Sequence, residues 1–510
     1  SDVPLANTGA SAVKPNLMFI IDDSGSMAWQ FSPDYVTEDF TGSKPAIEKE
    51  NCFYSLNNPN ENTSNSYTRC FPGDPTYTAP DFNYQYYNPA FTYSPAENYD
   101  NTQKTNMNAG NTSNWTSVPT NQFNKKKKNF ILEPSTTANL KKFPDRVFCK
   151  AASDSPTGVN CKKNTTTYQY PDNTYKYGRN ASGNIKYVEG DPYYYKMVPT
   201  EYCKEAELQN CTASTVPTGS YTFPALYRWC TSDNRTTCQK RQVGNYKYLK
   251  LNRNAFVKVD IIASKAPFPK ASTRTDCAGA TCTYDEEMTN FANWYSYYRT
   301  RMQTMKTAAS RVFSDLGDNY RIGLMSINVE SGAPNQGYVE VADYIGGAGN
   351  HKERWFNRLF ITNPTKSTPL RAALSRAGRY FAGLKPDGMD HDPMQYSCQQ
   401  NITLLTTDGY WNGANGVKLG GTEISNEDST NSGYSTRASG AYDGGLASSI
   451  KTLSDTAIYY YKTDLRNDSS TGSLGIPVGE DNVPGKGKDN AKHQHMTTYT
   501  LGLGLAGVMN

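Results

Sequence analysis

Residues 17–26 read Leu-Met-Phe-Ile-Ile-Asp-Asp-Ser-Gly-Ser, so a continuous apolar run ends abruptly in oxygen-bearing side chains. Such a run predicts a strand that is buried on both faces, as in the parallel sheet of an α/β domain. Open α/β sheets bind ligands in the crevice beyond the carboxyl ends of their strands, where Asp22, Ser24 and Ser26 would stand. Oxygen ligands suit a hard cation such as Mg²⁺ or Ca²⁺. The simpler alternative is a polar turn in which Asp22 or Ser24 caps a helix.

Two distant segments supply further oxygen ligands. Thr368 precedes Pro369, and apolar residues then recur at helical spacing through Leu384. Residues 401–407, Asn-Ile-Thr-Leu-Leu-Thr-Thr, predict a second buried strand that ends at Asp408. Each segment alone also has a purely structural interpretation: Thr368 would cap a helix, and Asp408 would belong to an Asp-Gly turn. All three segments in this order are much more specific than any one of them.

Together these three segments resemble the metal-ion-dependent adhesion site of von Willebrand factor A domains. The resemblance implies a doubly wound, mostly parallel, Rossmann-like α/β sheet that holds one divalent cation, Mg²⁺ in the first place, with Ca²⁺ or Mn²⁺ as alternatives. It further implies that Ser24, Ser26 and Thr368 ligate the metal directly. Asp22 and Asp408 would orient its water ligands. The last coordination position would be open to an acidic group of a partner.

The α/β pattern is interrupted by a long insertion. Residues 31–284 are rich in Tyr, Asn, Thr, Ser and Pro, and they hold more than half of the 38 tyrosines. We expect a loop- and strand-rich module between the first strand and the first helix of a discontinuous A-type domain, formed by residues 1–30 and 285–510. Its tyrosines either form an adaptable contact surface or supply the aromatic packing of a module with few aliphatic residues.

The eleven cysteines point to disulfides rather than to zinc, because the chain has no Cys-x-x-Cys and only four histidines. All but Cys398 fall into sequence-local couples, which favours an oxidising compartment. The expected pairs are 52–70, 149–161, 203–211, 230–238 and 277–282. Cys398 is left over as a buried free thiol or as the partner of a cysteine outside this segment.

Strand and helix patterns alternate from residue 285 onward, which predicts a parallel, doubly wound sheet. The pattern gives one long helix over 285–316 and a short helix over 351–360. Further helices are expected after Thr368 and over 443–465. The expected strands are 320–328, 338–345, 401–407 and 496–505.

Short segments of this second half resemble a narrower family, the PilC/PilY-type tip adhesins and assembly factors of type IV pili. The resemblance rests on Pro15-Asn16 and on residues 290–301, 406–412, 459–466 and 493–496, and it covers the start through residue 30 and most of 285–507. It implies secretion through the periplasm and display at the pilus tip or cell surface, held by minor pilins. The protein would bind host-cell or abiotic surface ligands and support pilus assembly. The alternative is a structural assembly cap or mechanosensing module in which the metal only stabilises loops.

Composition argues against several other classes. The net charge is +4 with both signs spread along the chain, so nothing demands a nucleic-acid partner. No stretch approaches the roughly 18 apolar residues of a membrane-spanning helix. A strand ending in Asp-Asp also occurs in phosphatases with a D-x-D motif, but the second acid would fall at Ser24, so we expect no enzymatic activity. The start at Ser1 fits a mature end after signal-peptide removal or a trimmed chain.

Overall fold

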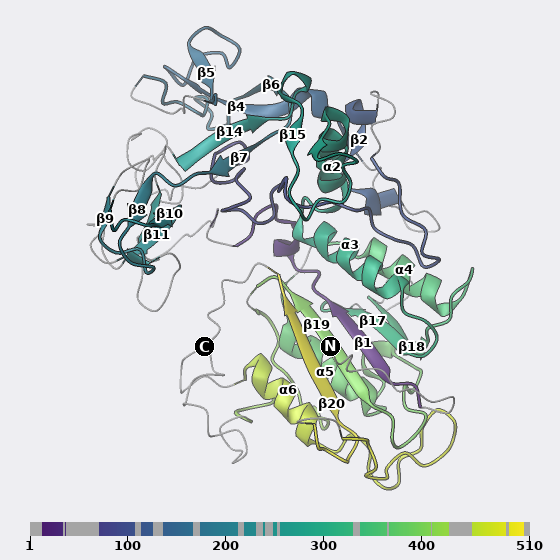
Figure 1. Cartoon of the computed structure of the whole chain (residues 1–510). Coiled ribbons are helices and arrows are strands. Elements are labelled where there is room, and N and C mark those ends of the chain that lie inside the picture. Colours follow the sequence, from purple (N-terminus) through teal and green to yellow (C-terminus); the bar gives the residue numbers. More distant parts are fainter. Residues whose placement is uncertain are drawn as a thin grey trace.

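The computed structural model describes residues 13–33, 36, 71–107, 114–125, 136–166, 174–212, 219–230, 238–239, 248–251, 255–329, 337–364, 367–409, 411–427, 451–485 and 489–503. Their central feature is a five-stranded sheet in the order β18-β17-β1-β19-β20 (Figure 1). Its strands are β1 (Asn16–Ile21), β17 (Arg321–Ser326), β18 (Tyr338–Asp343), β19 (Asn401–Thr407) and β20 (Met496–Gly502). β1 runs parallel to β17 and β19, and β20 runs parallel to β19, whereas β18 is antiparallel to β17.

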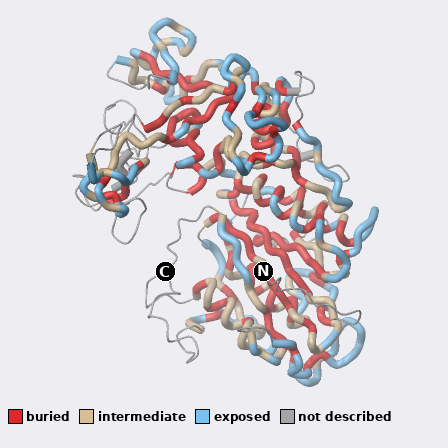
Figure 2. The backbone as a smooth tube through the Cα atoms, in the orientation of Figure 1, coloured by how far each residue is buried: buried red, intermediate tan, exposed pale blue. Residues whose placement is uncertain are grey.

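Helices cover both faces of this sheet, because successive side chains of β1 point into two different cores. Leu17 and Phe19 pack with residues of α3 (Arg301–Ser314) and α4 (His351–Ile361). Met18 and Ile20 pack with residues of α5 (Leu370–Phe381) and α6 (Leu453–Lys462) on the opposite face. β1 is buried along its whole length (Figure 2). The structure confirms the predicted α/β class with a parallel-containing sheet, whereas the von Willebrand A fold stays a prediction.

The predicted long helix over 285–316 is wrong, because the structure has two helices there. α2 (Tyr284–Tyr297) ends at its C-cap Tyr298, and α3 begins after Thr300. The Thr300 hydroxyl accepts a hydrogen bond from Gln303 N, and the Gln303 side chain accepts one from Thr300 N. This capping box satisfies backbone donors at the start of a new helix. The apolar periodicity continues across Thr300, so it does not reveal that the helix is interrupted there.

Apart from the start of the helix predicted over 443–465, the other predicted elements agree with the structure to within a few residues at their ends. α5 begins at Leu370, and Pro369 is its N-cap rather than its first residue. One continuous helix over 443–465 is wrong, because α6 begins at Leu453 after the N-cap Thr452; residues 443–450 lie outside the described ranges. No helix in the described part of the chain is long and apolar enough to cross a membrane.

In its described part, the segment between the loop after β1 and α2 consists of short strands and 3₁₀ turns joined by loops, in line with the predicted loop- and strand-rich module. The strands form small antiparallel sheets of two or three strands each. They are β2 (Val118–Pro119), β3 (Thr137–Ala138), β4 (Phe143–Cys149), β5 (Cys161–Lys163), β6 (Tyr187–Gly190), β7 (Tyr193–Met197), β8 (Glu201–Cys203), β9 (Cys211–Thr212), β10 (Phe223–Ala225), β11 (Tyr227–Cys230), β12 (Cys238–Gln239), β13 (Tyr248–Leu251), β14 (Phe256–Asp260), β15 (Phe268–Pro269) and β16 (Thr281–Cys282).

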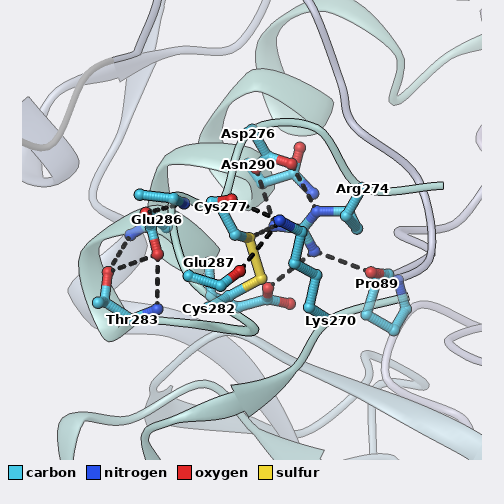
Figure 3. The surroundings of a disulfide bond; sticks show 12 residues. Pro89, Lys270, Arg274, Asp276, Cys277, Cys282, Thr283, Glu286, Glu287 and Asn290 are labelled. Carbon is cyan, nitrogen blue, oxygen red and sulfur yellow. Dashed lines mark hydrogen bonds and ion pairs between the residues drawn. A yellow bond between two sulfur atoms is a disulfide. The ribbon is translucent and has the colours of Figure 1, made fainter. Parts of the chain in front are cut away.

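Three predicted disulfides are confirmed: Cys149–Cys161, Cys203–Cys211 and Cys277–Cys282. The first two each join facing residues of paired strands. The third lies beside the start of α2, where Arg274 also contacts Glu287 (Figure 3). The predicted pair 52–70 lies outside the described residues, as does the side chain of Cys230 in the pair 230–238. Cys398 is a free, half-buried cysteine.

The aromatic residues of the insertion are mainly packing residues. The ring centroids of Tyr87 and Phe291 are 4.9 Å apart, as are those of Tyr86 and Trp294, so insertion tyrosines pack directly on α2. These residues belong to the same buried cluster as Phe19 of β1. One continuous hydrophobic core therefore joins the sheet to the insertion, which favours the packing interpretation of the tyrosines.

Candidate metal centre

The two predicted carboxylates meet where neighbouring strands end. Asp22 follows β1 and Asp408 follows β19, and the two strands pair in parallel with Ile20 opposite Leu405. α3, between β1 and β17, packs on one face of the sheet, whereas α5, before β19, packs on the other. The carboxyl ends of β1 and β19 therefore mark a topological switch point, the usual position of a ligand site in such sheets.

Hydrogen bonds join two carboxylates and two serines into a chain at this point, with one link through a backbone N–H. Ser24 N donates a 2.8 Å hydrogen bond to Asp22 Oδ1, which folds the loop back on the end of β1. The Ser24 and Ser26 Oγ atoms lie 3.1 Å apart, and Ser26 Oγ donates to Asp408 Oδ1 at 2.8 Å. Four of the five predicted ligands are thus joined by direct hydrogen bonds, although Asp408 lies at least 382 positions from the other three in the sequence.

The residues of the candidate site are buried, apart from the partly exposed Ser26. Asp22, Ser24 and Asp408 are each at most 1% exposed, whereas Ser26 has intermediate exposure. Thr407 Oγ1 donates a 2.8 Å hydrogen bond to the second oxygen of Asp22. Both oxygens of Asp22 therefore accept a hydrogen bond from the protein itself.

Thr368 belongs to a loop that is tied to the site through its neighbours. Thr368 N donates to Asn412 Oδ1 at 2.8 Å, and Asn412 N donates back to Thr368 O at 2.9 Å. On the other side, Asn328 Nδ2 donates to Asp23 Oδ1 and to Ser367 O at 2.7 and 2.8 Å. These contacts fasten the Thr368 loop both to the segment after Asp408 and to the loop after β1.

Arg301 also belongs to the site, although no local sequence pattern identifies it. Its Nη1 atom donates a 3.0 Å hydrogen bond to Asp408 Oδ2, in an ion pair whose side chains are 1% and 0% exposed. Its Nε atom donates to Phe31 O at 2.9 Å, and its backbone N donates to Trp29 O at 3.1 Å. The only sequence signal was the Thr300 cap, which places Arg301 in the first turn of α3 but says nothing about Asp408.

Opposing effects act on the Asp408 carboxyl. Burial raises the pKa of Asp408 above its usual range, and the nearby Asp22 charge adds to this increase. The Arg301 guanidinium and the Ser26 hydroxyl lower the pKa, because both stabilise the ionised form. A further cation beside Asp408 would favour ionisation in the same way.

The donor set fits a hard divalent cation. Two carboxylates and two hydroxyls are linked here by hydrogen bonds, the one to Asp22 through the backbone N of Ser24, and oxygen ligands of this kind suit Mg²⁺, Ca²⁺ or Mn²⁺. Bringing Asp22 and Asp408 together in a buried place also carries an electrostatic cost that a cation would offset.

The described arrangement is thus an open α/β sheet with a site lined by carboxylates and hydroxyls at its switch point. In sequence, the chain is similar to the type IV pilus biogenesis factor PilY1 of Pseudomonas aeruginosa strain UCBPP-PA14, with 32% identity over 251 residues, 48% of this chain and 21% of the relative. PilY1 of strain PAK is 33% identical over 257 residues, 46% of this chain and 20% of the relative.

The chain spans about a fifth of the length of the curated relatives it matches. No family model matches it, and no solved structure matches it. The predicted resemblance to type IV pilus factors is therefore supported over about half of the chain.

Proposed function

We propose that this chain is a von Willebrand A-type adhesive module of a type IV pilus tip factor, which binds acidic groups of host-cell or surface ligands through a divalent cation. The observation that carries the proposal is the chain of hydrogen bonds from Asp22 through Ser24 and Ser26 to Asp408. Similarity to pilus biogenesis factors supports the biological setting. The confirmed disulfides support folding in an oxidising compartment and display outside the cytoplasm.

In this proposal, Ser24, Ser26 and Thr368 hold the cation directly, and Asp22 and Asp408 hold its waters. When bound, the cation would supply a Lewis-acidic position that attracts a carboxylate oxygen of a partner. The protein's own part is to keep the oxygens in place. Thr407 orients Asp22, and Asn412 and Asn328 fix the loop that carries Thr368. Minor pilins would hold the module at the pilus tip.

A second candidate function is a structural cap for pilus assembly or a mechanosensing module, with the metal only stabilising loops. The shared core of the sheet and the insertion favours it, because Phe19 and Tyr87 belong to one buried cluster. Arg301 also ties Asp408 to the insertion side of the site through Phe31 O. A rigid connection of this kind would transmit load between the two parts.

Calorimetry with Mg²⁺, Mn²⁺ and Ca²⁺ tests the metal site itself. Asp22→Ala should abolish binding, whereas the matched control Asp23→Asn should retain it, because asparagine keeps the oxygen that accepts from Asn328. Equal binding by Asp22→Ala and the wild type would remove the site assignment. Adhesion and piliation assays on the same variants separate the two functions. Lost attachment with normal pili supports adhesion, and lost pili support assembly.

A further inference from the structure

The proposed metal centre contains a built-in cation. Arg301 Nη1 lies 3.0 Å from Asp408 Oδ2 and 3.4 Å from Asp408 O, and both side chains are excluded from water. Ser26 occupies the other oxygen of the same carboxylate. One oxygen of Asp408 therefore faces Ser26 in the centre, and the other pairs with the permanently charged guanidinium of Arg301. Metal ligation alone does not require such a guanidinium.

Arg301 is held from several sides and cannot easily swing away. Its Nε atom donates to Phe31 O, and its backbone N donates to Trp29 O. Its guanidinium carbon lies 5.1 Å from the Trp29 ring centroid and 5.5 Å from that of Phe31, and these two rings stack on each other. The group that contacts Asp408 is thus fixed by the segment that leaves the metal loop, and Trp29 reports on its position.

The local charges predict the consequence. Asp22 and Asp408 contribute two negative charges, and Arg301 contributes one positive charge in the same buried region. A divalent cation entering here meets the field of the guanidinium as well as that of the carboxylates, and repulsion is strong where water is excluded. Once filled, the centre carries an excess of positive charge, which attracts an anionic ligand.

We propose that Arg301 limits the divalent-cation affinity of the centre by competing with the metal for Asp408. This inference rests on the proposed metal-dependent function. Arg301 acts here as a positioning residue, because it acts on the cation through Asp408. The centre then holds its metal weakly until a carboxylate from a partner offsets the excess positive charge, so that metal and ligand strengthen each other's binding.

The test is Mn²⁺ and Mg²⁺ calorimetry at pH 8 on wild type, Arg301→Gln and Arg301→Lys. Arg301→Gln removes the charge but keeps a hydrogen-bond donor, so the divalent cation should bind about tenfold more tightly. Arg301→Lys keeps the charge and should stay within about twofold of the wild type. Unchanged or weaker binding by Arg301→Gln would overturn the inference.

The outcomes separate this inference from the proposed function. If Asp22→Ala loses metal binding while Arg301→Gln binds as the wild type does, only the role of Arg301 fails. If no form binds Mg²⁺, Mn²⁺ or Ca²⁺, the proposed metal-dependent function fails. Binding by Arg301→Gln but not by the wild type supports both.

A measurement on the native side chain covers the case in which Arg301→Gln does not fold. Mg²⁺ titration of the wild type should change tryptophan fluorescence, because drawing Asp408 toward the metal weakens its ion pair with the guanidinium beside the Trp29 ring and so changes the electrostatic field at that ring. The same titration of Trp29→Phe should lack this change. Identical fluorescence responses of the two proteins, with metal bound in both, would contradict competition for Asp408.

Discussion

Thr407 Oγ1 donates a 2.8 Å hydrogen bond to Asp22 Oδ2, and this bond joins the ends of two neighbouring parallel strands. Thr407 is the last residue of β19 and precedes Asp408 directly. The same residue therefore orients one carboxylate of the candidate centre while its backbone positions the other. The local sequence predicts that the strand ends at Asp408, but it does not reveal the hydrogen bond from Thr407 to Asp22.

The first prediction concerns this bond. Thr407→Val keeps the shape of the side chain but leaves Asp22 Oδ2 without its donor, so we expect the free energy of unfolding to fall by about 1–2 kcal/mol. Divalent-cation affinity should fall about threefold to tenfold, because a less constrained carboxylate binds its ligand less well. Denaturant unfolding and calorimetry measure the two effects.

Thr403→Val is the matched control for that variant. Thr403 lies on the same strand and is fully buried, and its Oγ1 has no hydrogen-bond partner among the described residues. Replacing it should be neutral or stabilising, because a buried hydroxyl without a partner is costly. Equal destabilisation by the two substitutions would show that the hydrogen bond to Asp22 contributes nothing specific.

The second prediction concerns a buried ion pair beside the Cys277–Cys282 disulfide (Figure 3). Arg274 Nη1 donates to Glu287 Oε2 at 2.9 Å, with the side chains 0% and 1% exposed. Burial raises the pKa of Glu287, and Arg274 opposes that effect. Arg274→Met should therefore lower the free energy of unfolding by about 3–5 kcal/mol, because it leaves the buried carboxylate of Glu287 without its positive partner.

Lys142→Met provides the comparison, because Lys142 and Glu189 form an ion pair with side chains that are 57% and 69% exposed. Its loss should cost at most about 1 kcal/mol. Adding Glu287→Gln to Arg274→Met should recover part of the lost stability, because the uncompensated negative charge of Glu287 is then removed. A similar cost for Arg274→Met and Lys142→Met in urea unfolding would refute the buried-pair argument.

The third prediction concerns the pH dependence of stability. Lys306 is fully buried on α3, its Nζ donates to Phe360 O at 2.9 Å, and desolvation lowers its pKa to about 7. The unfolded chain, with an ordinary lysine pKa, then binds more protons than the native state at pH values above 7. Native stability should therefore rise with pH through this group, by about 2 kcal/mol between pH 7 and pH 9.

Lys306→Met isolates this contribution, because all other titrating groups are unchanged. At pH 6 the variant should have its greatest stability relative to the wild type, which must bury the charged lysine there. This relative advantage should shrink steadily from pH 7 to pH 9. A stability difference that is independent of pH would show that Lys306 has an ordinary pKa in the native protein.

The sequence was sufficient to predict the parts of the fold that depend on short-range patterns. The apolar run of β1 and the similar run of β19 each end in the carboxylate that lies at the switch point. Asp22, Ser24 and Ser26 lie within five positions of one another, so one loop brings them together. Cysteine couples as close as Cys203 and Cys211 were predictable for the same reason.

The remainder depends on contacts that no local pattern specifies. Arg301 and Asp408 are 107 positions apart, and their contact requires the helix break at Thr300 that the apolar periodicity conceals. The placement of Tyr87 against Phe291 likewise depends on how the insertion folds back on α2. Tyrosine clusters have the same composition whether they are buried or exposed, so sequence alone left both interpretations open.

The fourth prediction concerns the close approach of α5 and α6. Gly378 lies on α5, and a Cβ atom at this position would overlap the ring of Tyr460 on α6. Gly378→Ala should gain about 1 kcal/mol of helix propensity but lose more through the forced displacement of a fully buried ring, for a net loss of about 1–3 kcal/mol. Gly317→Ala, where a Cβ atom meets nothing within 4 Å, should leave stability almost unchanged.

A double-mutant cycle that combines Gly378→Ala with Tyr460→Leu should show strong coupling, because the smaller side chain relieves the overlap. Additive effects in thermal or urea unfolding would mean that the two helices are not held at this distance.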